Sequence, residues 1–180
     1  MAFLLKEKTA LVTGSSRGIG RAIAESLAAD GAGVVINYAR NKQPAEAVVN
    51  NIVGKGGKAI AIGADISKSA EVRRLFSEAE KAMGPLDIVV ANAGVHIERP
   101  LIENTEADYD YIFDINTKGA YFTTQRLAPL IRAGGAIVFT TLAEGPATAN
   151  LSVYAGSKAA VRAFAQVFAA EFVVKGIRVN

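Results

Sequence analysis

Short apolar runs alternate along the chain with longer segments in which apolar residues recur every three or four positions. The short runs predict buried strands, and the longer segments predict helices that lay one face on a core. Strands are expected at Thr9–Thr13, Val34–Ile36, Ala59–Ile62, Ile88–Val90 and Ala136–Thr140, and a sixth begins at Ile177–Asn180. Because these strands are apolar on both faces and separated by helices, they predict a parallel sheet covered on both sides. The expected fold class is α/β, a doubly wound parallel sheet in three αβα layers, with residues 1–180 as a single domain ending at the start of the sixth strand.

Five helices are expected between these strands. The first has an apolar stripe of Ile19, Ile23 and Leu27 and ends at a glycine C-cap, Asp30-Gly31. The second spans Pro44–Val53, and the fourth is one long helix from about Thr105 to Ile131. The expected core faces of the third and fifth helices are, respectively, Val72, Leu75, Phe76, Ala79 and Met83, and Val161, Phe164, Ala165, Phe168 and Phe172.

Composition narrows the class of protein. The chain has no cysteine, which excludes disulfide scaffolding and thiolate catalysis, and its single histidine argues against a histidine-rich metal centre. The net charge is +3, but lysine and arginine are scattered, so a solvated surface is favoured over a nucleic-acid site. No apolar stretch reaches membrane-spanning length, and the opening residues are too short for a signal peptide. We therefore expect a soluble, cytoplasmic protein with no membrane partner.

Two motifs suggest chemistry. Tyr154 and Lys158 are four residues apart in a predicted helix, so the phenol and the ammonium share one face. A free tyrosine has a pKa of about 10, and a neighbouring cation favours its phenolate and brings it toward working pH. The second motif, Thr13–Gly20, follows a strand and opens a helix, which is the arrangement that holds a dinucleotide pyrophosphate.

Together and in this order, the two motifs resemble the short-chain dehydrogenase/reductase family, of the type that includes 3-oxoacyl-carrier-protein reductases. The similarity covers Lys8–Asn180, and three further signatures lie between the motifs: Asp65-Ile66, Ala91–Gly94 and Asn116. The glycine spacing G-x-x-x-G-x-G is typical of that family. The resemblance implies a Rossmann-like fold and a metal-free oxidoreductase that moves a hydride between a nicotinamide and a carbonyl or secondary alcohol. A 3-oxoacyl thioester is the family's default substrate.

The glycine turn is the predicted pyrophosphate site. Its glycines permit a tight turn, close approach of backbone to phosphate, and close packing of helix on strand. The cofactor-binding residues expected here are Gly14, Ser16, Arg17, Gly18, Ile19 and Gly20.

The end of the second strand predicts which dinucleotide binds. NAD-selective folds usually place Asp or Glu there to hold the ribose hydroxyls. This chain has Tyr38 at that place and Arg40 close by, with Arg17 in the glycine turn. Two guanidiniums could reach a 2′-phosphate, so NADP(H) is favoured over NAD(H). The alternative is that both arginines only cover the surface.

Two further signatures add cofactor contacts by resemblance. Asp65 and Ile66 resemble the family's adenine-contacting pair, although Asp65 could equally cap the turn before the next helix. In the family, Asn92 would brace the sheet, and the backbone of Ala93 and Gly94 would lie near the cofactor ribose. The family usually has Asn where this chain has Ala91.

The resemblance implies four catalytic residues. Tyr154 would be the general acid in reduction, and Lys158 would lower its pKa and hold the nicotinamide ribose. Asn116 would distort the long helix and help to position a water that relays protons to Lys158. The family's serine, thirteen residues before the tyrosine, is replaced here by Thr141, which keeps the hydroxyl and adds a methyl. Thr140 could take this role only if the register slipped by one residue.

His96 follows the Asn-Ala-Gly turn and could line the substrate pocket, but a solvated loop residue is the favoured interpretation.

The family normally continues past Asn180 with the rest of the sixth strand, a Pro-Gly segment that touches the nicotinamide, a substrate-covering loop and a seventh strand. We therefore expect the sequence to be a fragment. A nucleotide-binding scaffold or sensor with little catalysis is one alternative, and a sugar epimerase or dehydratase is another. The expected partners are a small carbonyl or alcohol substrate and further copies of the chain, in a homodimer or homotetramer.

Overall fold

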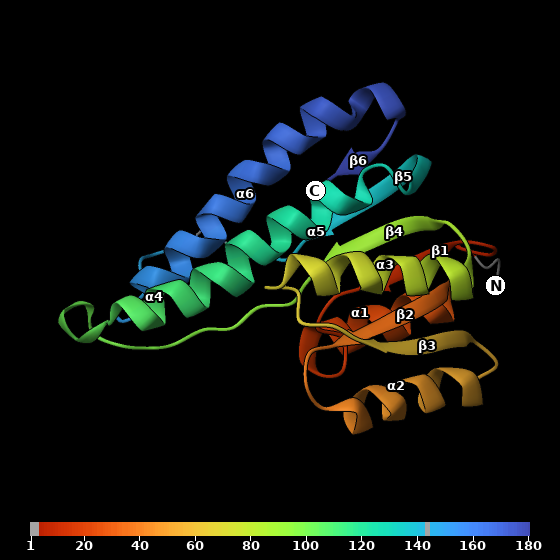
Figure 1. Cartoon of the computed structure of the whole chain (residues 1–180), viewed down its shortest axis with the longest axis horizontal. Coiled ribbons are helices and arrows are strands. Elements are labelled where there is room, and N and C mark those ends of the chain that lie inside the picture. The colour runs from red at the N-terminus through yellow and green to blue at the C-terminus, as the bar shows by residue number, and fades with distance from the viewer. Residues whose placement is uncertain (1–3, 143–144) are drawn as a thin grey trace.

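A computed structural model describes residues 4–142 and 145–180. Its centre is a parallel sheet with the strand order β3-β2-β1-β4-β5-β6 (Figure 1). The strands are β1 (Thr9–Val12), β2 (Gly33–Tyr38), β3 (Lys58–Gly63), β4 (Leu86–Ala91), β5 (Ile131–Phe139) and β6 (Arg178–Val179). The predicted α/β class and doubly wound parallel sheet are confirmed.

Helices cover both faces of this sheet. They are α1 (Gly18–Ala29), α2 (Lys42–Gly54), α3 (Ser69–Met83), α4 (Glu106–Phe113), α5 (Ala120–Leu127) and α6 (Ser152–Phe172). Two short 3-10 turns, η1 (Leu101–Glu103) and η3 (Val173–Lys175), accompany them, and a π-helical segment, η2 (Asp114–Gly119), joins α4 to α5.

The core is split by the sheet into two layers. One buries side chains of α3, α5 and α6, such as Phe76, Leu127 and Phe168, against one sheet face. The other buries Ala24 of α1 and Val48 of α2 against the opposite face. Strands buried on both faces explain why their sequence is continuously apolar instead of alternating.

The strand order reverses between β1 and β4, because β1 continues to β2 on one side while β4 continues to β5 on the other. Val12 pairs with both Ile36 of β2 and Val90 of β4, so the residues after these three positions emerge at one edge of the sheet. Ligands of doubly wound sheets bind at the carboxyl ends of strands beside such a reversal.

The apolar stripe predicted for α1 is correct in part. Ile23 and Leu27 are half-buried and pack against the core, whereas Ile19 is 70% exposed. The buried face of α1 consists of Gly20, Ala24 and Ala28. Small side chains allow the helix to lie close to the sheet. A prediction from the hydrophobic pattern instead places the largest apolar residues toward the core, so it gives glycine and alanine little weight.

The predicted single helix from Thr105 to Ile131 is also corrected. It consists of α4, η2 and α5, and Ile131 is the first residue of β5. The end of α1 agrees with prediction, since Gly31 follows the C-cap Asp30 and has a positive φ angle of 99°.

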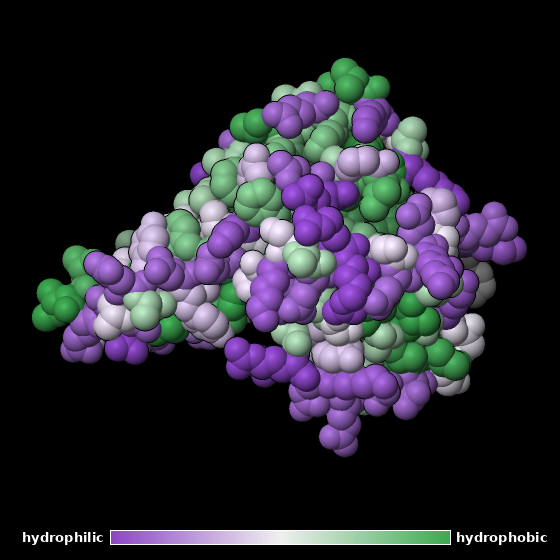
Figure 2. All heavy atoms as spheres, in the orientation of Figure 1, coloured by the Kyte–Doolittle hydropathy of each residue, from purple (hydrophilic) through white to green (hydrophobic). Residues whose placement is uncertain are grey.

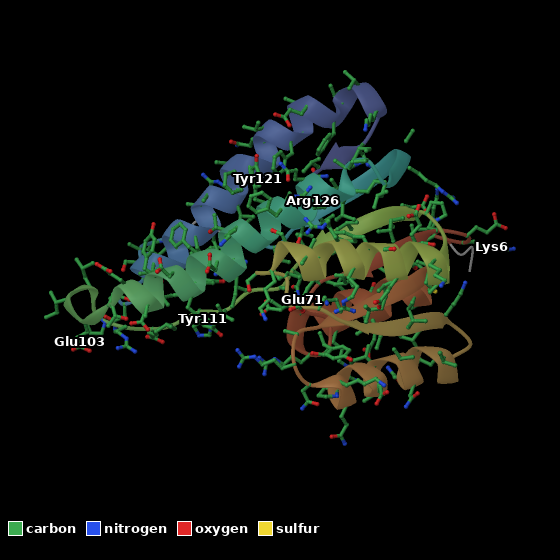
Figure 3. The ribbon with its side chains drawn as sticks, in the orientation of Figure 1. Lys6, Glu71, Glu103, Tyr111, Tyr121 and Arg126 are labelled. Carbon is green, nitrogen blue, oxygen red and sulfur yellow. The ribbon has the colours of Figure 1, made fainter. Side chains whose placement is uncertain are left out.

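Helices α4 and α5 follow each other end to end, and α6 lies beside them (Figure 1). Helix α4 and the start of α6 extend past the sheet on the side toward which the strand β4 points. The turn η1 forms the end of this extension, where Leu101 and Ile102 are 76% and 93% exposed, and Figure 2 shows hydrophobic surface there. Tyr121 of α5 reaches toward α6 (Figure 3) and contacts Phe164 and Phe168 at ring-centroid distances of 5.2 and 5.4 Å. In the described part of the chain, no helix is both long and apolar enough to cross a membrane.

Candidate functional site

The candidate site lies where β1, β4 and β5 end. The turn between β1 and α1 has two glycines with positive φ, Gly14 at 62° and Gly18 at 57°. A Cβ added at Gly14 would lie 2.8 Å from the Cα of Ala93, so the turn packs directly on the loop after β4. At Gly20, a Cβ would lie 2.7 Å from the Gly14 carbonyl oxygen and would also collide with the Asn92 side chain. Glycine at these positions allows three backbone segments to meet.

The N-terminus of α1 opens onto this turn. The N-cap is Arg17, whose backbone is extended, and within the described residues its side chain makes no capping hydrogen bond. The amides of the first helical turn have no partner inside a helix, and they carry the positive end of the helix dipole. Gly18 and Ile19 are exposed, so these donors can be reached by an anion such as a phosphate.

Two polar residues that the sequence analysis did not single out hold the turn in place. The Ser15 hydroxyl is completely buried, donates to the Val12 carbonyl at 2.6 Å and accepts from the Asn37 amide at 3.1 Å. The Asn37 side chain accepts from the Gly14 amide at 3.1 Å and donates to the Ala64 carbonyl, also at 3.1 Å. The detectable signal was a polar residue directly after the apolar run Val34–Ile36.

Three residues are expected to select the cofactor: Tyr38 is the last residue of β2, Arg40 follows two residues later, and Arg17 is the N-cap of α1. The Tyr38 ring is half-buried and lies against Gly63, where a Cβ would be 2.9 Å from the tyrosine Cζ. Arg17 and Arg40 are both exposed, and neither forms an ion pair with a carboxylate among residues 4–142 and 145–180. Both guanidiniums are therefore available to a ligand.

Asp65 and Ile66 are engaged with the protein itself. The Asp65 carboxylate accepts hydrogen bonds from the Ser67 amide at 3.0 Å and the Ser67 hydroxyl at 2.7 Å, which is the turn-capping alternative. Its amide donates to Glu71 at 2.8 Å, and this hydrogen bond is the main cause that lowers the pKa of Glu71, labelled in Figure 3. The Ile66 side chain is 6% exposed and belongs to the core.

The Asn-Ala-Gly turn ties three strand ends together. The Thr13 hydroxyl accepts from the amides of Asn92 and Ala93 at 2.9 and 3.0 Å. The Asn92 side chain donates back to the Thr13 carbonyl at 2.9 Å, and the Asn92 carbonyl accepts from the Thr140 hydroxyl at 3.3 Å. Gly94 follows as an exposed residue, so the bracing fixes its position at the edge of the site.

Lys158 lies beneath Gly94. Its side chain is nearly buried, with the residue 5% exposed, and its Nζ donates to the Thr140 carbonyl at 2.8 Å. Burial lowers the pKa of Lys158. A Cβ added at Gly94 would lie 3.3 Å from the lysine Nζ, so the ammonium faces the backbone of the Asn-Ala-Gly turn.

Asn116 sits in the π segment and is 1% exposed. Its Oδ1 accepts from the Val95 amide at 2.8 Å, while its Nδ2 donates to the Val95 carbonyl at 2.9 Å and to the Ser157 hydroxyl at 3.0 Å. A Cβ at Gly94 would lie 3.1 Å from the Asn116 Oδ1. Lys158, Asn116 and Gly94 therefore converge, and the long helix is distorted where Asn116 lies.

Tyr154 is half-buried on the same helix as Lys158. The His96 ring contacts the Tyr154 ring edge-on, with centroids 5.9 Å apart and an interplanar angle of 65°. His96 is exposed, as the solvated-loop interpretation has it, yet its ring lies beside the tyrosine.

Thr141 and Thr140 differ in environment. Thr141 is exposed, and its hydroxyl is free to meet a ligand, since no contact within the described residues occupies it. The Thr140 hydroxyl is used by the Asn92 carbonyl at 3.3 Å. Because the Thr140 hydroxyl is occupied and the Thr141 hydroxyl is free in the described part of the chain, the structure argues against a one-residue slip that would put Thr140 in the serine position.

Comparison with known proteins shows what this arrangement is similar to. A family model described as short chain dehydrogenase matches residues 8–180. The hydroxynaphthalene reductase-like protein Arp2 of Metarhizium guizhouense is 47% identical over 178 residues, which are 98% of this chain and 67% of that protein.

Solved structures agree. A dehydrogenase/reductase from Sinorhizobium meliloti 1021 superposes with a TM-score of 0.96 at 37% identity. The match covers 99% of this chain and 72% of the Sinorhizobium chain. A short chain dehydrogenase from Burkholderia cenocepacia J2315, in complex with NADP, has a TM-score of 0.93 at 41% identity. The match covers 98% of this chain and 73% of the Burkholderia chain.

Proposed function

The chain belongs to the short-chain dehydrogenase family of oxidoreductases, and we propose that it catalyses NADP(H)-dependent interconversion of a carbonyl and a secondary alcohol. The single observation that carries this proposal is the convergence on Gly94. The Asn116 Oδ1 and the Lys158 Nζ would lie 3.1 and 3.3 Å from a Cβ at that glycine, and Lys158 follows Tyr154 by four residues on α6. A side chain at residue 94 would press on both groups, and glycine leaves that space to a ligand.

The residues present fit a dinucleotide. The uncapped N-terminus of α1 offers amide donors to a pyrophosphate, and the glycines at 14 and 20 keep side chains out of the turn. Gly94 and Lys158 would hold the nicotinamide ribose, whose hydroxyls the lysine ammonium can reach as a donor. When bound, the nicotinamide supplies the hydride.

The acid–base work falls to the chain's own residues. Tyr154 donates its phenolic proton to the substrate oxygen in reduction and takes it back in oxidation. The buried ammonium of Lys158 stabilises the phenolate that remains. The Thr141 hydroxyl donates a hydrogen bond to the substrate oxygen as its negative charge develops. The Asn116 side chain is held by the backbone of Val95 and lies beside Lys158 at Gly94. There it would help to position a water that relays protons to Lys158.

The substrate class is proposed from similarity. The relative named a hydroxynaphthalene reductase-like protein favours bicyclic aromatic ketones. The alternative, a 3-oxoacyl thioester, rests on the family resemblance of the sequence alone. The protein is proposed to act in the cytoplasm as a dimer or tetramer that pairs through α4, α5 and α6. Exposed apolar residues on these helices, including Tyr109, Tyr111 and Val167, support pairing there.

The direct test is Tyr154→Phe, which removes one hydroxyl and keeps the ring. NADPH oxidation should be followed with a panel of both ketone classes, and NADPH affinity should be measured alongside. We expect turnover to fall by about two to four orders of magnitude at unchanged cofactor affinity. Comparable turnover would remove Tyr154 from the mechanism. Binding of NADPH by the wild type without turnover on any ketone would favour a nucleotide-binding scaffold.

Cofactor preference has its own test in Arg17→Ala combined with Arg40→Ala. Each arginine is proposed to donate charge-assisted hydrogen bonds of about 1.5–3 kcal/mol to a 2′-phosphate before screening. The NADP complex of the similar Burkholderia structure supports the choice of cofactor. The double variant should weaken NADPH far more than NADH in binding titrations, and added salt should reduce the wild-type preference. Equal losses for both cofactors would assign these arginines to the shared part of the dinucleotide.

Arg126 of α5 offers the matched control, since it is exposed and forms no ion pair with a carboxylate among the described residues. Arg126→Ala removes a surface guanidinium of the same kind. It should leave the ratio of the two affinities unchanged.

A further inference from the structure

Ser157 is completely buried on α6, one residue before Lys158 and three after Tyr154. Its hydroxyl makes two hydrogen bonds. It donates to the Tyr154 carbonyl at 2.7 Å and accepts from the Asn116 Nδ2 at 3.0 Å. One side chain therefore connects the tyrosine's own backbone to the π segment.

A second contact joins the same two elements. The Thr117 hydroxyl, next in the π segment, donates to the Ser157 carbonyl at 3.2 Å. The neighbours Asn116 and Thr117 thus bind the hydroxyl and the carbonyl of one serine. In a regular helix, consecutive side chains point about 100° apart, and the π-helical turn is a local departure from that geometry.

We propose that Ser157 is a positioning residue for the acid–base pair, and this inference rests on the proposed function of Tyr154 and Lys158. Ser157 holds the helical turn that bears both side chains at a fixed distance from Asn116. It also completes the hydrogen bonding of the Asn116 amide, so that Oδ1 stays on the Val95 amide at 2.8 Å.

The physical effect of losing the hydroxyl follows from these contacts. A serine that bonds back to the carbonyl three residues earlier bends its helix slightly. Without it, the turn from Tyr154 to Lys158 relaxes toward regular geometry, and the Asn116 Nδ2 keeps only the Val95 carbonyl as acceptor. Since misplacement by about 1 Å can reduce a rate about 100-fold, small shifts here matter for turnover.

The test is Ser157→Ala, with Thr124→Val as the matched control. Thr124 is also completely buried and also bonds back along its helix, to the Ala120 carbonyl at 3.0 Å. It lies on α5, and within the described part of the chain its hydroxyl makes no hydrogen bond to a proposed site residue. We expect Ser157→Ala to lower kcat about 10- to 100-fold with KM for NADPH within about twofold, because positioning acts on the transition state. Thr124→Val should keep kcat within about twofold. Equal losses in the two variants would overturn the proposal.

Two further measurements keep the inference testable on its own. Hydrogen exchange at the Val95 amide should accelerate in Ser157→Ala and stay unchanged in Thr124→Val, whether or not a substrate is known. Thr117→Val, which removes only the contact to the Ser157 carbonyl, should lower kcat in the same direction by a smaller factor. Absent turnover in the wild type would refute the proposed function. Unchanged Val95 exchange would refute the role of Ser157 separately.

Discussion

Gly14 and Gly18 form a matched pair for testing how the glycine turn is built. Both have positive φ, 62° and 57°, where a side chain is strained. They differ in their surroundings. A Cβ at Gly18 would meet nothing within 4 Å, whereas one at Gly14 would lie 2.8 Å from the Cα of Ala93 and 3.0 Å from its Cβ.

This difference sets the expected magnitudes. Gly18→Ala carries only the backbone strain, about 1–2 kcal/mol, which the reduced entropy of the unfolded chain partly offsets. Gly14→Ala adds a collision with backbone that cannot rotate away, and overpacking of this kind costs about 1–3 kcal/mol more. We therefore expect losses of about 1 kcal/mol at Gly18 and about 2–4 kcal/mol at Gly14.

Urea unfolding with a common m-value measures both free energies of unfolding. The Gly14→Ala variant should also weaken NADPH binding, since Ala93 can move only by shifting the loop that holds Asn92 and Gly94. Equal losses at Gly14 and Gly18 would show that this loop yields freely. The idea that the turn and the Asn-Ala-Gly loop form one rigid unit would then be wrong.

Three other outcomes are expected. Thr123→Val should be neutral or stabilising by up to about 1–3 kcal/mol in thermal unfolding, because the Thr123 hydroxyl is fully buried and finds no partner among the described residues; a clear loss of stability would reveal a hidden partner. Burial lowers the pKa of Lys158 from its ordinary value of 10.5. At pH values between the lowered pKa and 10.5, the unfolded chain binds more protons than the folded chain, so stability rises with pH across this window. Lys158→Met should flatten that rise in unfolding measured at a series of alkaline pH values, and an unchanged slope would contradict a buried ammonium. His96→Phe should keep turnover closer to wild type than His96→Ala does, because only the former retains the ring contact with Tyr154 at 5.9 Å; the reverse order would assign the imidazole a polar role toward substrate.

The order of strands and helices was predictable because strand sequence and burial agree. Val34, Val35 and Ile36 are all fully buried, as an apolar run between helices indicates. The face of α1 was not predictable in the same way. Its buried positions are glycine and alanine, which allow the helix to lie close to the sheet. These residues contribute little to a hydrophobic pattern, so the pattern does not reveal the buried face.

The candidate site could be proposed from the sequence where a residue type is chemically conspicuous. Tyr154, Lys158 and the glycine turn are recognisable from spacing, and the structure brings Lys158 to Asn116 around Gly94. The supporting residues were not recognisable. Ser15, Asn37 and Ser157 act through hydrogen bonds to groups that lie 22 to 41 residues away in the sequence, so their roles exist only after folding.

The π segment also makes chain length matter at one place. A π-helical turn holds one residue more than the α-helical path that it replaces. Removing one residue from Asp114–Gly119 would therefore let the segment revert to α-helix while α4 and α5 keep the faces that they present to the core. Leu127 would stay buried, whereas Asn116 would lose the place from which it donates to the Ser157 hydroxyl. At the exposed turn η1, an insertion would displace only solvent and leave Asn116 in place, so changes of chain length at η2 and at η1 should differ in their effect on the candidate site.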